Sequence, residues 1–285
     1  ETRVDVALRC GVTPQQRKPM ADTISRDLVE GFEFEPERVS VTSEYQAEKL
    51  RCCGINPDVF GEDVDPSFFI LLGIQAGAHN GISAEGNVNM LQMLKQFRPV
   101  GLGEVLTVRG GINKVTEVPR GVTVDTWIEF ADAAGHTVID ASRISLKPDP
   151  AKSAERGAGD RPAPVVANPE DLPSLSSHQF TPEAVTGYSS EGNSIHYDMP
   201  AANAAGFRAP IIGGGMGVHF LTAALWQAHK PAALNLDISF RRPIFWDHAF
   251  AVRASEDGSA ICLESAGKVL TEARVGSLVP GVASV

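Results

Sequence analysis

One order of elements is predicted twice in this 285-residue chain, and this repetition limits the possible folds more than any other feature. An apolar helix is predicted at Phe68–Ala78, followed by β-rich segments up to residue 146. A second apolar helix at Met216–Trp226 is again followed by strands, between residues 234 and 278. An apolar helix packed on an antiparallel sheet buries the sheet's inner face. We therefore predict an α+β protein with two similar halves side by side.

The strands are predicted from β-branched alternation and the turns from breaks that contain glycine or aspartate. In the first half the predicted strands are Glu104–Val108, Val122–Phe130 and Thr137–Leu146, with turns at Gly110-Gly111 and Asp132–Gly135. In the second half they are Leu234–Phe240, Ala249–Ala254, Ala260–Glu264 and Val269–Val275. An internal duplication is also supported by a short signature that begins corresponding segments, Phe97-Arg98-Pro99 and Phe240-Arg241-Arg242-Pro243.

The boundary between the halves is predicted from proline. Six prolines lie between residues 148 and 174, among alanine, glycine and charged residues, which is the composition of a linker. The N-terminal residues show no clear periodicity. We therefore predict a tail at 1–24, an N-terminal half at 25–148, a linker at 149–174 and a C-terminal half at 175–285.

Composition argues against several classes of partner and location. The formal net charge is −10 and there is no basic stripe, so no nucleic-acid partner is expected. The longest apolar run, Phe68–Ala78, is shorter than the roughly 20 residues that span a bilayer, so no membrane segment is expected. Four cysteines without CxxC spacing, and a first stretch without a continuous apolar run, favour a cytoplasmic protein over a secreted one.

The residues with the most chemistry lie at 187–226. A polar loop carries Glu191, Asn193 and His196, so a proton-exchanging imidazole, a carboxylate and an orienting amide lie close together in sequence. Pro210–Gly215 then leads into the second apolar helix. Glycines allow a ligand to approach the first helical N–H groups, which have no partner within the helix. An acid–base pair facing such an oxyanion hole suits the addition of water to an α,β-unsaturated thioester, or its removal.

This stretch resembles the MaoC-like, R-specific enoyl-CoA hydratase family, also called hydratase 2. The family's Asp-x-Asn-Pro-hydrophobic-His-x-Asp loop matches Glu191-Gly-Asn193-Ser-Ile195-His196-Tyr-Asp198. Its Gly-Phe-x-x-Pro-Ile-x-His-Gly segment matches residues 206–214. The resemblance implies the hot-dog fold, a long helix wrapped by an antiparallel sheet, here duplicated as a double hot-dog with one catalytic half.

The same resemblance implies roles for the individual residues. His196 and Glu191 would activate the water, and Asn193 would order the site. The Gly214 N–H would polarise the thioester carbonyl and stabilise the enolate. The neighbouring Gly213, Gly215 and Ile195 would line the substrate site.

Two positions depart from the family pattern, and the first half offers an internal comparison. Glu191 stands where the family has aspartate, and Gly213 stands where it usually has histidine. The corresponding first-half loop, Arg51–Val59, keeps an Asn-Pro pair but has no histidine at the matching place. The first half is therefore expected to shape the acyl tunnel and not to catalyse.

Other polar residues have weaker signals. Arginine binds phosphate in a bidentate manner, so three arginines are candidate contacts for CoA or carrier-protein phosphates, the alternative being ordinary surface charge. These three are Arg208, Arg241 and Arg242. His219 lies inside the apolar helix and is expected to be a hydrogen-bonded core histidine. No His, Cys or Asp cluster has metal-ligand spacing, so no metal or redox cofactor is expected.

The sequence thus predicts a hydro-lyase, an enoyl-CoA hydratase or 3-hydroxyacyl thioester dehydratase, R-specific by resemblance. Its substrate would be an acyl-CoA or an acyl carrier protein thioester, and a homodimer is possible. Two alternatives stay open: a hot-dog acyl-CoA thioesterase, and a non-catalytic acyl-thioester binding protein that the departures at Glu191 and Gly213 would suit.

Overall fold

The computed structural model describes residues 27–281, apart from residues 153, 154, 156, 158, 160, 190 and 191. The predicted tail and Glu191 lie outside these residues. The helices are α1 (Ser43–Cys52), α2 (Phe68–His79), α3 (Pro182–Ser189), α4 (Met199–Ala204) and α5 (Gly214–His229), with short 3-10 turns that include η3 (Pro57–Val59), η5 (Pro169–Asp171) and η6 (Ser194–His196).

The strands of the first half are β1 (Glu37–Val39), β2 (Val88–Gln96), β3 (Leu106–Val118), β4 (Gly121–Ala131), β5 (Thr137–Asp140) and β6 (Arg143–Pro148). Those of the second half are β7 (Ser174–Gln179), β8 (Pro231–Phe240), β9 (Ala249–Ala254), β10 (Ala260–Ser265) and β11 (Lys268–Pro280).

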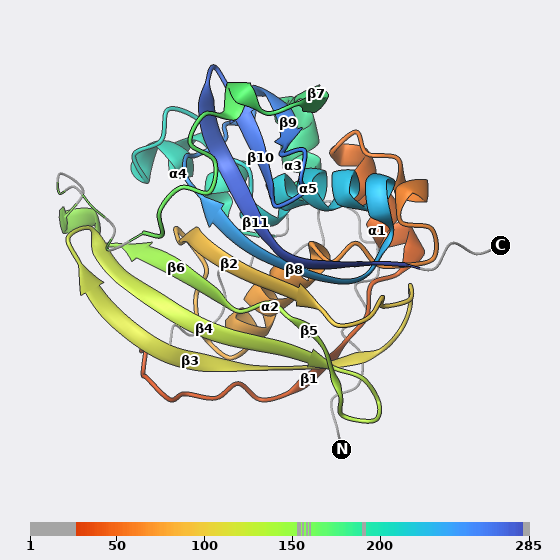
Figure 1. Ribbon diagram of the computed structural model, residues 1–285. Coiled ribbons are helices and arrows are strands. Elements are labelled where there is room, and N and C mark those ends of the chain that lie inside the picture. The colour runs from red at the N-terminus through yellow and green to blue at the C-terminus, as the bar shows by residue number, and fades with distance from the viewer. Residues whose placement is uncertain are drawn as a thin grey trace.

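All these strands belong to one curved sheet, in which the two halves lie side by side (Figure 1). The order is β1-β3-β4-β5-β2-β8-β11-β10-β9-β7, and β6 pairs with both β2 and β4. The halves join where β2 pairs antiparallel with β8, with Leu94 opposite Leu236. The predicted side-by-side arrangement of two helix-and-sheet halves is confirmed.

The two apolar helices lie against the inner face of the sheet, α2 behind first-half strands and α5 next to β8, β10 and β11 (Figure 1). The Phe69 ring of α2 packs edge-on against Phe130 of β4, with 4.9 Å between centroids. On α5, Met216 and Leu221 are completely buried. The helices predicted at Phe68–Ala78 and Met216–Trp226 are confirmed. Both are apolar on most sides, which is stable only for a helix that other elements cover on most sides.

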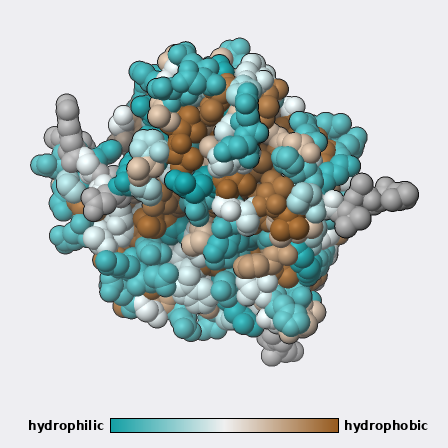
Figure 2. Space-filling view, viewed as in Figure 1, coloured by the Kyte–Doolittle hydropathy of each residue, from teal (hydrophilic) through white to brown (hydrophobic). Residues whose placement is uncertain are grey.

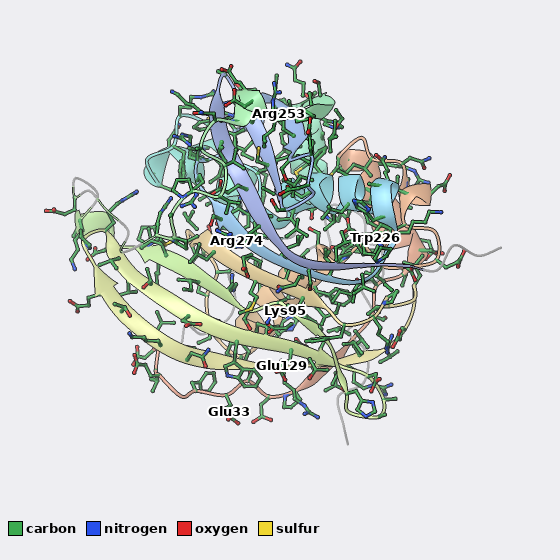
Figure 3. The ribbon with its side chains drawn as sticks, viewed as in Figure 1. Glu33, Lys95, Glu129, Trp226, Arg253 and Arg274 are labelled. Carbon is green, nitrogen blue, oxygen red and sulfur yellow. The ribbon has the colours of Figure 1, made fainter. Side chains whose placement is uncertain are left out.

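The outer face of the sheet carries polar side chains. Lys95 on β2 and Glu129 on β4 both lie opposite Asp140 of β5, so these three residues form one row (Figure 3). In the face shown in Figure 2, hydrophilic side chains cover most of the first-half strands, and apolar side chains gather over the second half and at the border between the halves. Polar residues outside and apolar residues inside are the expected alternation for strands covered on one face.

The strand predictions were correct for most of the second half, but two first-half predictions were wrong. Gly110 and Gly111 do not form a turn, because β3 continues through them. A Cβ at Gly110 would lie 2.6 Å from Ile128 Cδ1, so glycine here allows close packing of the helix-facing layer. β2 was not predicted, although it is the strand that joins the halves. The strand predicted at 137–146 is two strands, β5 and β6.

The proline-rich segment is held against the outer side of the second half. The backbone N–H groups of Val165 and Val166 donate to the two carboxylate oxygens of the buried Glu272, at 3.0 and 2.9 Å. Val166 also packs with Cys262 and Val269. The described part of this segment near Val166 is therefore packed against the second-half sheet. None of the described helices is long and apolar enough to span a membrane.

Candidate active site

Asn193 ties the polar loop of the second half to the first half. Its Oδ1 accepts a hydrogen bond from the Gly86 N–H at 3.1 Å, and its Nδ2 donates to the carbonyls of Ala84 and Asn87 at 3.0 and 3.2 Å. Asn193 is also the residue before η6, where Oδ1 accepts from the Ile195 N–H at 3.4 Å. Because these contacts use both ends of the amide, the buried Asn193 positions the loop.

Glu85 forms a second contact between the halves. Its carboxylate accepts hydrogen bonds from the Ser194 hydroxyl and from the Ser194 N–H. Glu85 comes from the segment that leads into β2, whereas Ser194 begins η6. The η6 turn is therefore held from the first half on both Asn193 and Ser194, immediately before His196.

His196 ends η6 with its ring orientation fixed. Its Nδ1–H donates to the Ile211 carbonyl at 2.8 Å, which leaves Nε2 as the acceptor in the neutral imidazole. Burial lowers the pKa of His196 to about 4, although the Ile211 carbonyl and the negative charge of Glu85 act in the opposite direction. The imidazole is therefore neutral near pH 7 and can accept a proton at Nε2.

The glycines 213–215 begin next to His196 Nε2. A Cβ at Gly213 would be 3.6 Å from His196 Nε2, so the Gly213 backbone borders the imidazole. Gly213 is in extended conformation and α5 begins at Gly214, without a side-chain cap. The first N–H groups of a helix have no intrahelical partner and carry the positive end of the helix dipole. The structure thus brings His196 together with the predicted oxyanion donors.

The surroundings of Gly214 and Gly215 are crowded. A Cβ at Gly214 would lie 3.0 Å from the Phe240 ring and 3.2 Å from Asn89 Nδ2. The Gly215 carbonyl accepts a hydrogen bond from the Ser67 hydroxyl at 2.7 Å. The start of α5 is therefore braced by a first-half side chain.

The other predicted site residues lie in different surroundings. Ile195 is buried, and its carbonyl accepts from the Ile211 N–H at 3.2 Å, so its backbone joins η6 to the segment before α5. Arg208 is exposed, forms an ion pair with Asp247 at 2.8 Å and stacks over the Phe245 ring. These contacts leave Arg208 at the surface.

Arg241 and Arg242 are both held by the protein itself. Arg241 forms an ion pair with the fully buried Glu272 at 2.6 Å and donates to the carbonyls of Pro162 and Ala163. Arg242 donates to the Val269 carbonyl at 2.6 Å. Arg241 therefore stabilises the packed linker, and a phosphate would compete with these contacts.

His219 is a fully hydrogen-bonded core residue, as expected. Its Nδ1 lies 2.6 Å from Asp65 Oδ2, both side chains being completely buried, and its Nε2 lies 2.7 Å from the Tyr188 hydroxyl. The other Asp65 oxygen accepts from the Thr222 hydroxyl at 2.8 Å and from the Ser67 N–H at 2.9 Å. This network links α3, α5 and the start of α2.

The first half repeats the loop without its histidine. Asn56 precedes η3 and accepts a hydrogen bond from the Asp58 N–H, as Asn193 does from the residue two positions on. Val59 ends η3 where His196 ends η6. Val59 therefore occupies the first-half position that corresponds to His196.

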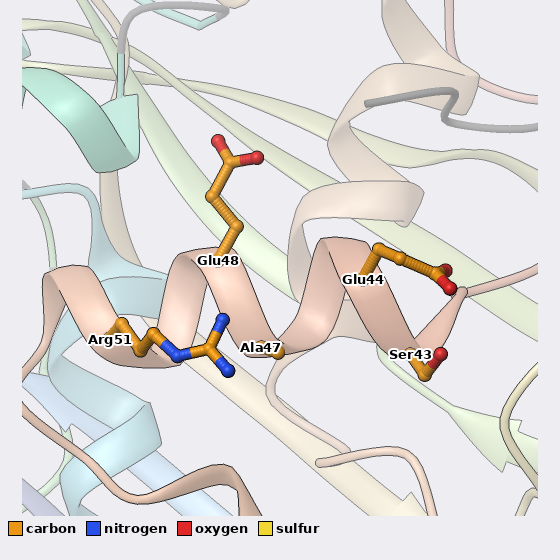
Figure 4. A pocket seen from close by; sticks show the side chains of 5 residues that line it. All are labelled: Ser43, Glu44, Ala47, Glu48 and Arg51. Atoms are coloured by element: carbon orange, nitrogen blue, oxygen red, sulfur yellow. The ribbon is translucent and has the colours of Figure 1, made fainter. Parts of the chain in front are cut away.

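Two residues near the site were missed from the sequence, Glu85 and Asn89. Asn89 lies on β2 and Glu85 in the segment before it, and this strand was not predicted. A surface hollow lies elsewhere, along one side of α1 (Figure 4), and contains none of the predicted site residues. It is lined by Ser43, Glu44, Ala47, Glu48 and Arg51.

The fold and the loop together define a class: a double hot-dog protein whose second half alone carries a histidine loop against a glycine-started helix. The chain is 25% identical over 187 residues to 3-hydroxyacyl-thioester dehydratase X of Mycobacterium tuberculosis, which is 62% of this chain and 62% of the relative. The match therefore spans less than two thirds of that relative's length. No protein-family model matches the chain.

Solved structures with a similar fold include MaoC-like dehydratases. The crystal structure of HtdX from M. tuberculosis aligns with a TM-score of 0.67 and 19% identity, covering 86% of this chain and 98% of that one. A MaoC-like dehydratase from Phytophthora capsici aligns with a TM-score of 0.63 and 17% identity, covering 86% and 96%. The predicted double hot-dog fold is confirmed.

Proposed function

We propose that the protein is a hydratase/dehydratase of 2-enoyl and 3-hydroxyacyl thioesters, R-specific as the motif implies. The observation that carries this proposal is the neutral His196, whose Nε2 faces the glycine-started end of α5. The similarity to 3-hydroxyacyl-thioester dehydratase X supports it. A homodimer, a cytoplasmic location and the choice between CoA and a carrier protein remain predictions from the sequence.

In the hydration direction, the thioester carbonyl would accept a hydrogen bond from the Gly214 N–H. His196 Nε2 would take a proton from a water while its oxygen bonds to the β-carbon, and the displaced π electrons would move onto the carbonyl oxygen as an enolate. The positive end of α5 stabilises this charge. A protonated Glu191 would then give its proton to the α-carbon, which completes the addition. The proton on His196 would pass through solvent to the Glu191 carboxylate, which restores both groups for the next turnover.

The dehydration direction uses the same groups in reverse. The Glu191 acid would first pass its proton through solvent to His196. The Glu191 carboxylate would then take the α-proton, and the protonated His196 would give its proton to the departing hydroxyl. Because the Ile211 carbonyl holds the Nδ1–H of His196 in both directions, only Nε2 gains or loses a proton. Asn193 and Glu85 contribute by holding η6 in place.

The test is His196→Ala with a short-chain 2-enoyl-CoA, followed by the loss of enoyl absorbance. Removing a general base lowers the rate by about 100- to 10,000-fold, so hydration should fall by at least that lower factor. The matched control is His229→Ala at the exposed end of α5, which should keep full activity. Unchanged turnover in His196→Ala would contradict the mechanism.

A thiol reagent distinguishes the thioesterase alternative. A hydratase changes the enoyl absorbance without releasing CoA thiol, whereas a thioesterase releases thiol from saturated acyl-CoA as well. Binding of acyl-CoA without either signal would favour the non-catalytic alternative.

A further inference from the structure

Arg143 is a cation on the inner face of the first-half sheet. It lies opposite Gln92 of β2 and Thr126 of β4, and paired residues of neighbouring strands project to the same face. Two positions along β4, Ile128 faces Gly73 of α2. Arg143 therefore points to the side of the sheet that the helices cover, where arginine is uncommon.

No carboxylate of the described residues pairs with Arg143. Its Nη1 donates to Asn89 Oδ1 at 3.1 Å, and its Nε is buried without a hydrogen-bond partner. Burial lowers the pKa of Arg143 to about 10, whereas ion pairs with Glu104 and Asp247 raise the pKa of Arg98 and Arg208. Arg143 is partly buried, and a charge on the covered face of a sheet without a counterion is costly, so this group is a candidate for binding an anion.

The side chains around Arg143 are neutral and polar. Gln92 is almost completely buried, and its amide nitrogen is held by three carbonyls, those of Met93, Ala141 and Ser142. Its Oε1 has no partner among the described residues. Ser145, in register with Asn89, faces the same side. The residues in register with Arg143 are therefore polar, whereas the next inward residues of the same strands, such as Ile128 and Leu94, are apolar and buried.

Asn89 connects this cation to the proposed oxyanion site. Its Oδ1 accepts from Arg143, and its Nδ2 lies 3.2 Å from the position of a Cβ at Gly214. Only the width of one amide group therefore separates the start of α5 from the guanidinium. A substrate whose carbonyl is held by the Gly214 N–H has the end of a short acyl chain within reach of Arg143.

We propose that Arg143, oriented by Asn89, binds a carboxylate at the far end of a short acyl group, so that the preferred substrates are thioesters of dicarboxylic acids. This inference rests on the proposed function of the same site. The phosphates of CoA are the other source of anionic oxygens, but Arg143 Nε is buried on the inner face of the sheet, and the adenosine and phosphates of CoA need an open surface.

The experiment compares adipyl-CoA with hexanoyl-CoA by titration calorimetry, since the two ligands differ only in the terminal carboxylate. A hydrogen-bonded ion pair predicts about 10- to 100-fold tighter binding of adipyl-CoA. Arg143→Met should abolish that preference, and Arg143→Lys should retain part of it. The matched control, Arg109→Met, removes an exposed positive charge on β3 and should leave the preference unchanged.

Equal or weaker binding of adipyl-CoA by the unaltered protein would overturn the inference. So would an equal loss of affinity for both ligands in Arg143→Met, because that result assigns the arginine to the CoA phosphates. If Arg143→Met does not fold, the preference of the unaltered protein and the Arg143→Lys variant decide.

Hydration of 2,3-dehydroadipyl-CoA and 2-hexenoyl-CoA separates this inference from the proposed function. Turnover of both at equal efficiency supports the hydratase and overturns the carboxylate preference. A clear binding preference for adipyl-CoA without hydration of either enoyl thioester supports the anion site and contradicts the hydratase.

Discussion

Acidification should destabilise the folded protein through His196. In the unfolded chain this imidazole takes a proton near pH 6.5, whereas burial lowers its pKa to about 4 in the folded protein. Between those values the unfolded state binds more protons, so stability rises with pH. The stabilisation is therefore complete above pH 6.5 and is lost as the pH falls toward 4. The difference corresponds to about 3 kcal/mol, and allowing for the partial exposure of the side chain we expect about 2 kcal/mol.

Urea unfolding of the intact chain and of His196→Gln measures this contribution. Glutamine can still donate to the Ile211 carbonyl but does not titrate. Burial also lowers the pKa of His178 and His248, but both residues are present in the two proteins and their effects cancel. Between about pH 7.5 and about pH 4.5, the unaltered protein should lose about 2 kcal/mol more unfolding free energy than the variant.

Equal losses in the two proteins would refute the reasoning, because they would mean that the imidazole takes up its proton in the folded state as easily as in water. The rate provides an independent check. The acid limb of hydration should lie well below pH 6.5, since His196 must be neutral to accept the proton from water. An acid limb near pH 6.5 would contradict a buried base.

Two further predictions follow from the packing around α5. Gly214→Ala should lower the kcat/KM of hydration about 10-fold while the melting temperature changes little. The new methyl group would displace Phe240 and Asn89 Nδ2 by a few tenths of an ångström. Unchanged kcat/KM would mean that this contact does not shape the site. Asp65→Ala should reduce the unfolding free energy by about 3–5 kcal/mol, since it removes the partner of the buried His219 Nδ1 and of the Ser67 N–H. Asp65→Asn should cost less, because His219 can change tautomer to accept from the new amide, and equal losses in urea unfolding would contradict this reasoning.

The sequence by itself determined the local elements and their order. The apolar runs gave α2 and α5, and the alternating segments gave most of the second-half strands, because hydrophobic periodicity is a property of neighbouring residues. The loop around His196 was also predictable, since its residues lie within a few positions of one another. The repeated Asn–turn pattern, capped by Asn56 and by Asn193, predicted which half would lack the histidine.

Only the tertiary structure decided what surrounds that histidine. Glu85 and Ser194 are 109 positions apart, and they meet because β2 pairs with β8 in one register. Gly110 and Gly111 suggested a turn, yet they serve the close approach of Ile128 and Trp127. Nothing in the sequence singled out Arg143. Its importance depends on the face of the sheet that it occupies, and on the fact that no carboxylate of the described residues pairs with it there. Such contacts between distant segments are set by strand register and burial, which no short stretch of sequence contains.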